Sequence, residues 1–232
     1  MNGLKLLFKR WVSHKVFFIC TLALFVGMMT AVMIFHENPG NYESDEADYL
    51  MCKICALLPM VLGIMISSIL TANEVVGSRF MRAIPAADRM FRVGFPLFGL
   101  LVSLGWGLAI NLTYAAFILT SGGDICNISD MLLLTAPFAL FCTFLPAFMF
   151  SSRFGALAGL FMYFPFLFLV WGISSLPKSV KYDGFGLPVW QSALITAGAY
   201  LLGFALAAVI SGVCYRRGDF REQEYYAGVY RK

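Results

Sequence analysis

The sequence predicts an all-α membrane protein whose six transmembrane helices form a single domain over residues 1–232. Three observations predict this fold. Apolar residues make up 60% of the chain and charged residues only 13%, about half the charged share of a soluble domain. Several apolar runs exceed the roughly 18 residues that indicate a membrane-spanning helix. The basic residues lie mainly between these runs, on one side of the predicted membrane.

Residues 1–15 predict an amphipathic helix that lies in the membrane interface. Lysines 5 and 9 alternate with apolar residues, and Leu4, Phe8 and Trp11 fall near one face of a helix. The apolar run that follows, 16–35, is too long for the core of a cleavable signal peptide, and we interpret it as a retained first span.

The remaining spans follow from uninterrupted apolar runs, none of which contains Asp, Glu, Lys, Arg or His. The third and sixth runs are longer than a hydrocarbon core of about 30 Å requires, so we expect these helices to tilt or to project from it. The six spans are predicted at about 16–35, 54–72, 93–120, 131–150, 154–176 and 189–214, and residues 215–232 form a tail.

The distribution of charge predicts that both termini lie in the cytoplasm, and we expect the plasma membrane as the location of the protein. With the N-terminus inside, 14 of the 17 Lys and Arg residues fall in inside segments, whereas eight of the 13 acidic residues fall outside. A bias of this size is typical of membrane topology. It explains the net charge of +4 better than nucleic-acid binding does, so we expect lipid rather than nucleic acid as a partner.

The sequence contains no motif for chemistry of its own. It has only two histidines and neither a Walker motif nor a glycine-rich dinucleotide loop. A proton-driven carrier usually needs an ionisable group within a span, and the predicted spans have none. We therefore expect no catalytic residue, no metal site and no cofactor bound by this chain. The sequence leaves open whether Cys52, Cys55 or Cys126 forms a disulfide.

Small residues recur every four positions in the third and sixth spans. Such spacing lets helix backbones approach closely, either within one bundle, which we favour, or at a seam between two chains. These positions are Gly99, Ser103 and Gly107 in the third span and Gly203, Ala207 and Ser211 in the sixth.

Two further groups are candidates for a substrate path. Asn111, Thr113 and Tyr114 form a polar set in the outer part of the third span, for which hydrogen bonding between helices is the favoured alternative. The fourth and fifth spans are rich in phenylalanine, and Phe141 and Phe144 are the candidates to contact an apolar cargo. Lipid-facing or core positions are the more common role of such residues.

The inside segment 73–92 combines apolar residues with four arginines. Pro85 interrupts it, so we expect a short amphipathic helix over 75–83, a turn, and a second helix that begins near Asp88. A short helix that two spans present to the cytoplasm is suited to docking another protein. The alternative is that the arginines only set the topology or contact anionic headgroups.

The chain resembles the transmembrane subunit of bacterial type-2 ABC transporters. In that family the loop between spans two and three often has a Glu, a later Gly, and a Leu/Ile-Pro pair followed by small and basic residues. Glu74, Gly77, Ile84, Pro85 and the pair Asp88-Arg89 match this pattern, whereas Ala86-Ala87 replaces the Ser/Thr-type residue often found after the proline.

The resemblance implies that residues 1–15 are an elbow helix and that the loop is a coupling helix seated on a separate ATPase, which binds ATP and Mg²⁺. It further implies a second permease chain, as a homodimer or heterodimer. The residues implied in ATPase coupling are Glu74, Gly77, Arg79, Phe80, Arg82, Ile84, Pro85 and Arg89.

The function implied is that of a non-enzymatic permease subunit of an ABC exporter. Small members of the family with short outer loops resemble exporters of amphipathic or antimicrobial peptides. The main alternative is a membrane scaffold or sensor subunit that recruits a cytoplasmic partner without transport. A membrane enzyme is disfavoured because the predicted spans contain no charge.

Overall fold

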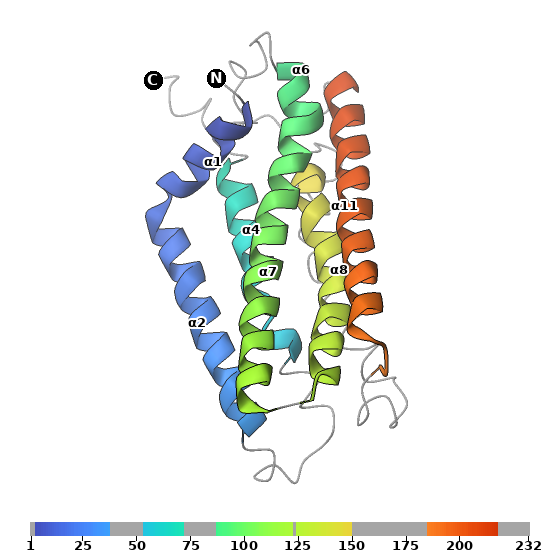
Figure 1. Ribbon diagram of the computed structural model, residues 1–232. Helices are drawn as coiled ribbons and strands as arrows, with labels where there is room; N and C mark the ends of the chain where they lie inside the picture. Colours follow the sequence, from blue (N-terminus) through green and yellow to red (C-terminus); the bar gives the residue numbers. More distant parts are fainter. Residues whose placement is uncertain (1–2, 38–52, 72–86, 123, 150–184, 218–232) are drawn as a thin grey trace.

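The computed structural model of the chain describes residues 3–37, 53–71, 87–122, 124–149 and 185–217. Within these ranges all regular structure is helical, and the helices lie side by side in a bundle (Figure 1). The elements are α1 (Gly3–Ser13), α2 (Lys15–Glu37), α4 (Leu58–Thr71), α6 (Ala87–Arg89), the π-helix η3 (Met90–Gly94), α7 (Phe95–Ser121), α8 (Cys126–Met149) and α11 (Val189–Arg217).

Four helical segments are long and apolar enough to cross a membrane, with mean hydropathies between 1.8 and 2.4. They are Lys15–Ile34, Ala87–Ser121, Cys126–Ala147 and Val189–Arg216, and they correspond to the first, third, fourth and sixth predicted spans. The chain is thus a multi-pass, helical membrane protein. In the second predicted span the apolar stretch Lys53–Ile64 is shorter. The fifth span and residues 218–232 lie outside the described residues, so the count of six spans stays a prediction.

The two ends of the bundle differ in the elements that they contain (Figure 1). One end holds α1, α6 and the last turns of α11, and we call it the α6 end. The opposite end holds the turn between α7 and α8 and the first turn of α11. Lys53 contacts the first turn of α8 there, and we call this the Lys53 end. The charge pattern predicts that the α6 end faces the cytoplasm.

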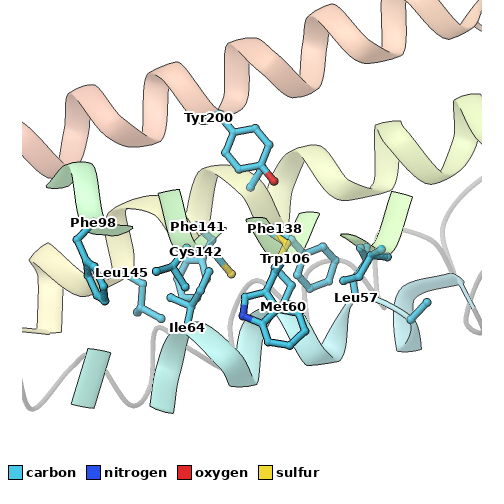
Figure 2. Packing of buried hydrophobic residues seen from close by; sticks show 14 of the residues in the cluster. Leu57, Met60, Ile64, Phe98, Trp106, Phe138, Phe141, Cys142, Leu145 and Tyr200 are labelled. Carbon is cyan, nitrogen blue, oxygen red and sulfur yellow. The ribbon is translucent and has the colours of Figure 1, made fainter. Parts of the chain in front are cut away.

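A core of apolar side chains lies between α8 and its neighbours (Figure 2). On α8, Phe138 and Cys142 are at most 1% exposed. Met60 and Ile64 of α4 reach them from one side, and Figure 2 shows Tyr200 pointing toward the same core from α11. Helix α8 thus packs against α4, α7 and α11.

The third predicted span is part of a longer continuous helix. Elements α6, η3 and α7 follow one another without a break over Ala87–Ser121, 35 residues in all. At 1.5 Å per residue this element is about 52 Å long, well beyond a hydrocarbon core of about 30 Å. The boundary predicted at residue 93 therefore falls inside the helix, and a helix of this length must tilt or project from the hydrocarbon.

Helix α7 ends at a glycine that reverses the chain. Gly122 adopts a left-handed conformation, with φ of 71°, and its N–H donates to the carbonyl of Ile118. A side chain would strain this conformation, and glycine is the residue that adopts it at little cost. The turn lets α8 begin at Cys126 and run back antiparallel to α7.

Candidate functional site at the α6 end

The predicted ATPase-coupling residues fall almost entirely outside the described part of the chain. Glu74, Gly77, Arg79, Phe80, Arg82, Ile84 and Pro85 lie in the undescribed range 72–86. Arg89 is described, and it is exposed at the end of α6. The helix predicted to restart near Asp88 is present from Ala87. The structure therefore shows the element that follows the predicted docking loop.

Within that element, α6 is followed by a π-helical turn, η3, whose cause lies in the local sequence. The N–H of Phe95 donates to the carbonyl of Met90, five residues earlier. Pro96 comes next and has no N–H. The Phe91 carbonyl would receive the Phe95 N–H in an α-helix, and that of residue 96 in a π-helix. π-Turns of this kind often occur at functional sites.

Helix α11 supplies a donor to the Phe91 carbonyl. The hydroxyl of Ser211 donates a hydrogen bond to the carbonyl of Phe91. One turn further along α11, the ring of Tyr215 stacks on that of Phe91, with centroids 5.6 Å apart and planes at 21°. The guanidinium of Arg92 lies 5.9 Å from the centroid of the same Tyr215 ring. Three contacts therefore join η3 to the last turns of α11.

The charged side chains on α6 and η3 remain partly accessible. Arg92 pairs with Asp88 across one helical turn, with Nε 2.7 Å from Oδ1 and side-chain exposures of 38% and 51%. Arg89 between them is exposed. An exposed pair of this kind contributes little to stability, so these charges are available to a partner.

Helix α1 packs against the opposite side of this region through its apolar face. Leu7 is fully buried, and the ring of Phe98 lies 5.1 Å from that of Phe8 and 6.5 Å from that of Trp11. Lys5 and Lys9 are exposed. The amphipathic helix expected in residues 1–15 is thus present, but its apolar face contacts the protein. Its location in the membrane interface, as an elbow helix, stays a prediction.

A small cavity lies beside α1, with a volume of about 10 Å³. That volume is about enough for one water molecule, so it is too small to pass a peptide. Its lining residues are Trp11, His14, Phe17, Phe18, Thr21, Gly63 and Trp106.

The predicted polar set of the substrate path takes part in helix packing. The amide of Asn111 donates to the Thr135 hydroxyl of α8 over 3.0 Å, and to the Gly107 carbonyl over 2.8 Å. Thr113 donates to the Ala109 carbonyl of its own helix, and Tyr114 is 1% exposed. For Asn111, these contacts correspond to the alternative of hydrogen bonding between helices.

The two phenylalanines predicted for the same path lie elsewhere on α8. The rings of Phe141 and Phe144 are 5.4 Å apart and meet edge to face. Phe141 follows Thr135, the partner of Asn111, by six residues, which is about 9 Å along a helix. The structure therefore does not bring these phenylalanines together with Asn111 in one site.

All six small residues of the predicted stripes are buried within the bundle. A Cβ on Gly99 would lie 2.9 Å from the Thr143 carbonyl oxygen of α8, and one on Gly203 would lie 2.7 Å from that of Leu140. A Cβ on Gly107 would overlap the hydroxyl of Tyr200, which donates to the Ser103 carbonyl over 3.3 Å. Ala207 is fully buried. The stripes thus allow α7, α8 and α11 to approach closely.

The sequence analysis missed a buried ion pair at the Lys53 end. The Lys53 ammonium lies 3.5 Å from Asp130 Oδ2, and the two side chains are 1% and 5% exposed. Lys53 also donates to the side-chain oxygen of Asn127, and Asp130 accepts the backbone N–H of Phe185. One feature of the sequence could have indicated this pair, because both residues directly precede a predicted span on the same side of the membrane.

Burial affects the protonation of Lys53, which lies just outside the second predicted span. Desolvation lowers the pKa of Lys53 to about 8, although the neighbouring Asp130 opposes this shift. A charged lysine at this position is therefore costly without its carboxylate partner.

Hydroxyl groups extend this polar cluster to the start of α11. Ser129 donates to the carbonyl of Leu187 over 2.6 Å and shares a hydrogen bond of 2.8 Å with Ser192. Thr196 donates to the Leu132 carbonyl over 2.7 Å. Lys53, α8 and the first turns of α11 are therefore joined by polar contacts at this end.

The described cysteines are free thiols. Cys55 and Cys126 form no disulfide, and Cys52 lies outside the described residues. In the same described ranges, no three His, Cys, Asp or Glu side chains come together in a way that would hold a metal ion.

Comparisons with protein families, with curated proteins and with solved structures found no match to this chain.

Proposed function

We propose that this chain is the membrane-spanning permease subunit of an ABC exporter that couples to a separate ATPase. The observation that supports the proposal is the continuous helix of residues 87–121. It begins within the predicted inside segment 73–92 and packs against α1, α8 and α11. A displacement of residues 73–86 would therefore reach the membrane core through one element.

Charge adds to this support. Arg89 is exposed at the start of the continuous helix, and Arg79 and Arg82 precede it in the sequence. In the proposed complex these arginines pair with acidic residues of the ATPase. ATP and Mg²⁺ bind to that subunit, and a second permease chain completes the translocation path.

The test is co-purification with a candidate ABC-type ATPase, sought among the genes beside this one, followed by ATP turnover of the complex in nanodiscs. The triple variant Arg79→Glu, Arg82→Glu, Arg89→Glu should lose the ATPase. The matched single variants are Arg89→Glu and Arg216→Glu, because both reverse one exposed arginine and only Arg89 borders the docking segment. Arg89→Glu should weaken the complex, and Arg216→Glu should not. Full binding by the triple variant would refute docking.

The proposed cargo is an amphipathic or antimicrobial peptide, or another apolar molecule, as the family resemblance implies. Uptake of a labelled cationic amphipathic peptide into inverted vesicles that contain the complex tests it. A complex that binds its partner but shows neither stimulated ATP turnover nor uptake would instead be a scaffold or sensor.

A further inference from the structure

The carbonyl of Phe91 accepts a hydrogen bond from another helix at the α6 end. In the π-turn the N–H of Phe95 donates to the carbonyl of Met90, and Pro96 has no N–H. Phe91 is 1% exposed, and its carbonyl accepts the hydroxyl of Ser211 in α11. Loss of a buried hydrogen bond is costly, so this bond ties η3 to α11.

The contact with Ser211 joins distant parts of the chain. Ser211 lies 120 residues after Phe91, on the last predicted span. Helix α6 directly precedes η3 and connects it along the chain to the predicted docking segment. Tyr215 strengthens the same junction by stacking on Phe91, and it also faces Arg92. Any rotation of η3 must carry the end of α11 with it or break these contacts.

We propose that Ser211 and Tyr215 are positioning residues, which transmit movement of the docking segment to α11 through the Phe91 carbonyl and ring. This inference rests on the proposed function, because it assumes that an ATPase moves the segment. Movement of the docking segment would thus reach the membrane core in two ways, directly along α7 and through α11. ATP binding to the partner subunit would then move the sixth span at the α6 end of the bundle. The predicted docking loop itself connects the second and third spans.

The variants separate the hydroxyl from the bulk of the side chain. Ser211→Ala removes the donor, and Ser211→Thr retains it. Tyr215→Leu removes the stacked ring, and Tyr215→Phe retains it. Thr143→Val is the matched control, because it removes a buried hydroxyl that donates to the Ala139 carbonyl of its own helix.

The first measurement is ATP turnover of the assembled complex relative to that of the ATPase alone. Ser211→Ala and Tyr215→Leu should bind the ATPase as the wild type does, yet reduce the stimulation by about fivefold or more, the lower range of a typical coupling between sites. Ser211→Thr, Tyr215→Phe and Thr143→Val should retain it. A purely structural role would instead reduce assembly and stimulation together.

The second measurement is backbone hydrogen exchange of the complex with and without ATP analogue and Mg²⁺. In the wild type, exchange should change in both 87–98 and 207–217, whereas in Ser211→Ala it should change only in 87–98. Wild-type coupling in Ser211→Ala by both measurements would overturn the inference and leave the proposed function intact. Failure of the wild-type chain to bind the ATPase would overturn both, and is recognised by the absence of any complex.

Discussion

The two ends of the bundle hold their helices together by different kinds of contact. At the Lys53 end, Lys53 pairs with Asp130 from another helix, and both side chains are buried. At the α6 end, Asp88 pairs with Arg92 on its own helix, and this pair is partly exposed. The contacts described between η3 and α11 there are the stacked rings of Phe91 and Tyr215, the contact of Arg92 with Tyr215, and the hydroxyl of Ser211.

This difference indicates a different role for each end. A buried ion pair is costly to open, because separation leaves two uncompensated charges in an apolar environment. Stacked rings and one hydrogen bond are weaker and more easily rearranged. We therefore expect the Lys53 end to be the stable end of the bundle and the α6 end to be the one that moves.

The strongest test of this comparison is Asp130→Asn. It leaves the buried ammonium of Lys53 without its carboxylate, and breaking a buried pair costs about 3–5 kcal/mol. Thermal unfolding of the purified protein in detergent should show a large loss of stability. The double variant Lys53→Met, Asp130→Leu is the control and should recover most of it. A stability of Asp130→Asn equal to that of the wild type would show that the pair does not stabilise this end.

The second test is the pH dependence of stability in the alkaline range. Because burial lowers the pKa of Lys53 from 10.5 to about 8, the unfolded chain binds more protons than the folded one between these values, and stability should rise with pH across this window. The cost of the buried charge is fully present below pH 8 and is relieved above it. Unfolding of the wild type and of Lys53→Met should be compared from pH 7 to 10.5. An identical slope in both would contradict this assignment.

At the α6 end, the expected effect of Phe8→Ala is smaller and local. The variant removes the ring that meets both Phe98 and Trp11, and aromatic pairs contribute about 0.5–1.5 kcal/mol each beyond burial. We expect faster hydrogen exchange in residues 3–13 and little change in α8. Phe8→Leu, which keeps an apolar side chain, serves as the control. Equal loss of protection throughout the bundle would mean that α1 is not a separable element.

The smallest effect is expected for Asp88→Asn. Its pair with Arg92 is partly exposed and lies within one helix, and such pairs contribute about 0.5 kcal/mol or less. The unfolding temperature should remain close to that of the wild type. A loss comparable to that of Asp130→Asn would remove the distinction between the two ends.

The outline of the fold was predictable from local patterns. Uninterrupted apolar runs predicted the first, third, fourth and sixth spans, because the hydrocarbon core requires a minimum length of apolar helix. The amphipathic pattern of Leu4, Phe8 and Trp11 predicted α1 for the same local reason. The surface on which α1 packs was not predictable, because an apolar helix face packs equally well on lipid or on α7.

The candidate site was predictable only in part. The pattern of charges predicted Arg89 as a candidate, and Pro85 predicted that a new helix begins near Asp88. Pro96 indicated an irregular turn, but not which residue would serve the Phe91 carbonyl. Ser211 was assigned to a stripe of small residues, because its spacing from Gly203 and Ala207 concealed its role as a donor.

The sequence by itself determined that this is a helical membrane protein, and it identified an inside segment, 73–92, that combines apolar residues with four arginines. These properties depend on length, composition and neighbours along the chain. Only the tertiary structure decided that Lys53 meets Asp130 and that Ser211 meets Phe91. In each pair the partners lie on different helices and are separated by many residues, so no local period relates them. Whether a polar group at a helix end is paired or solvated depends on which helices pack together.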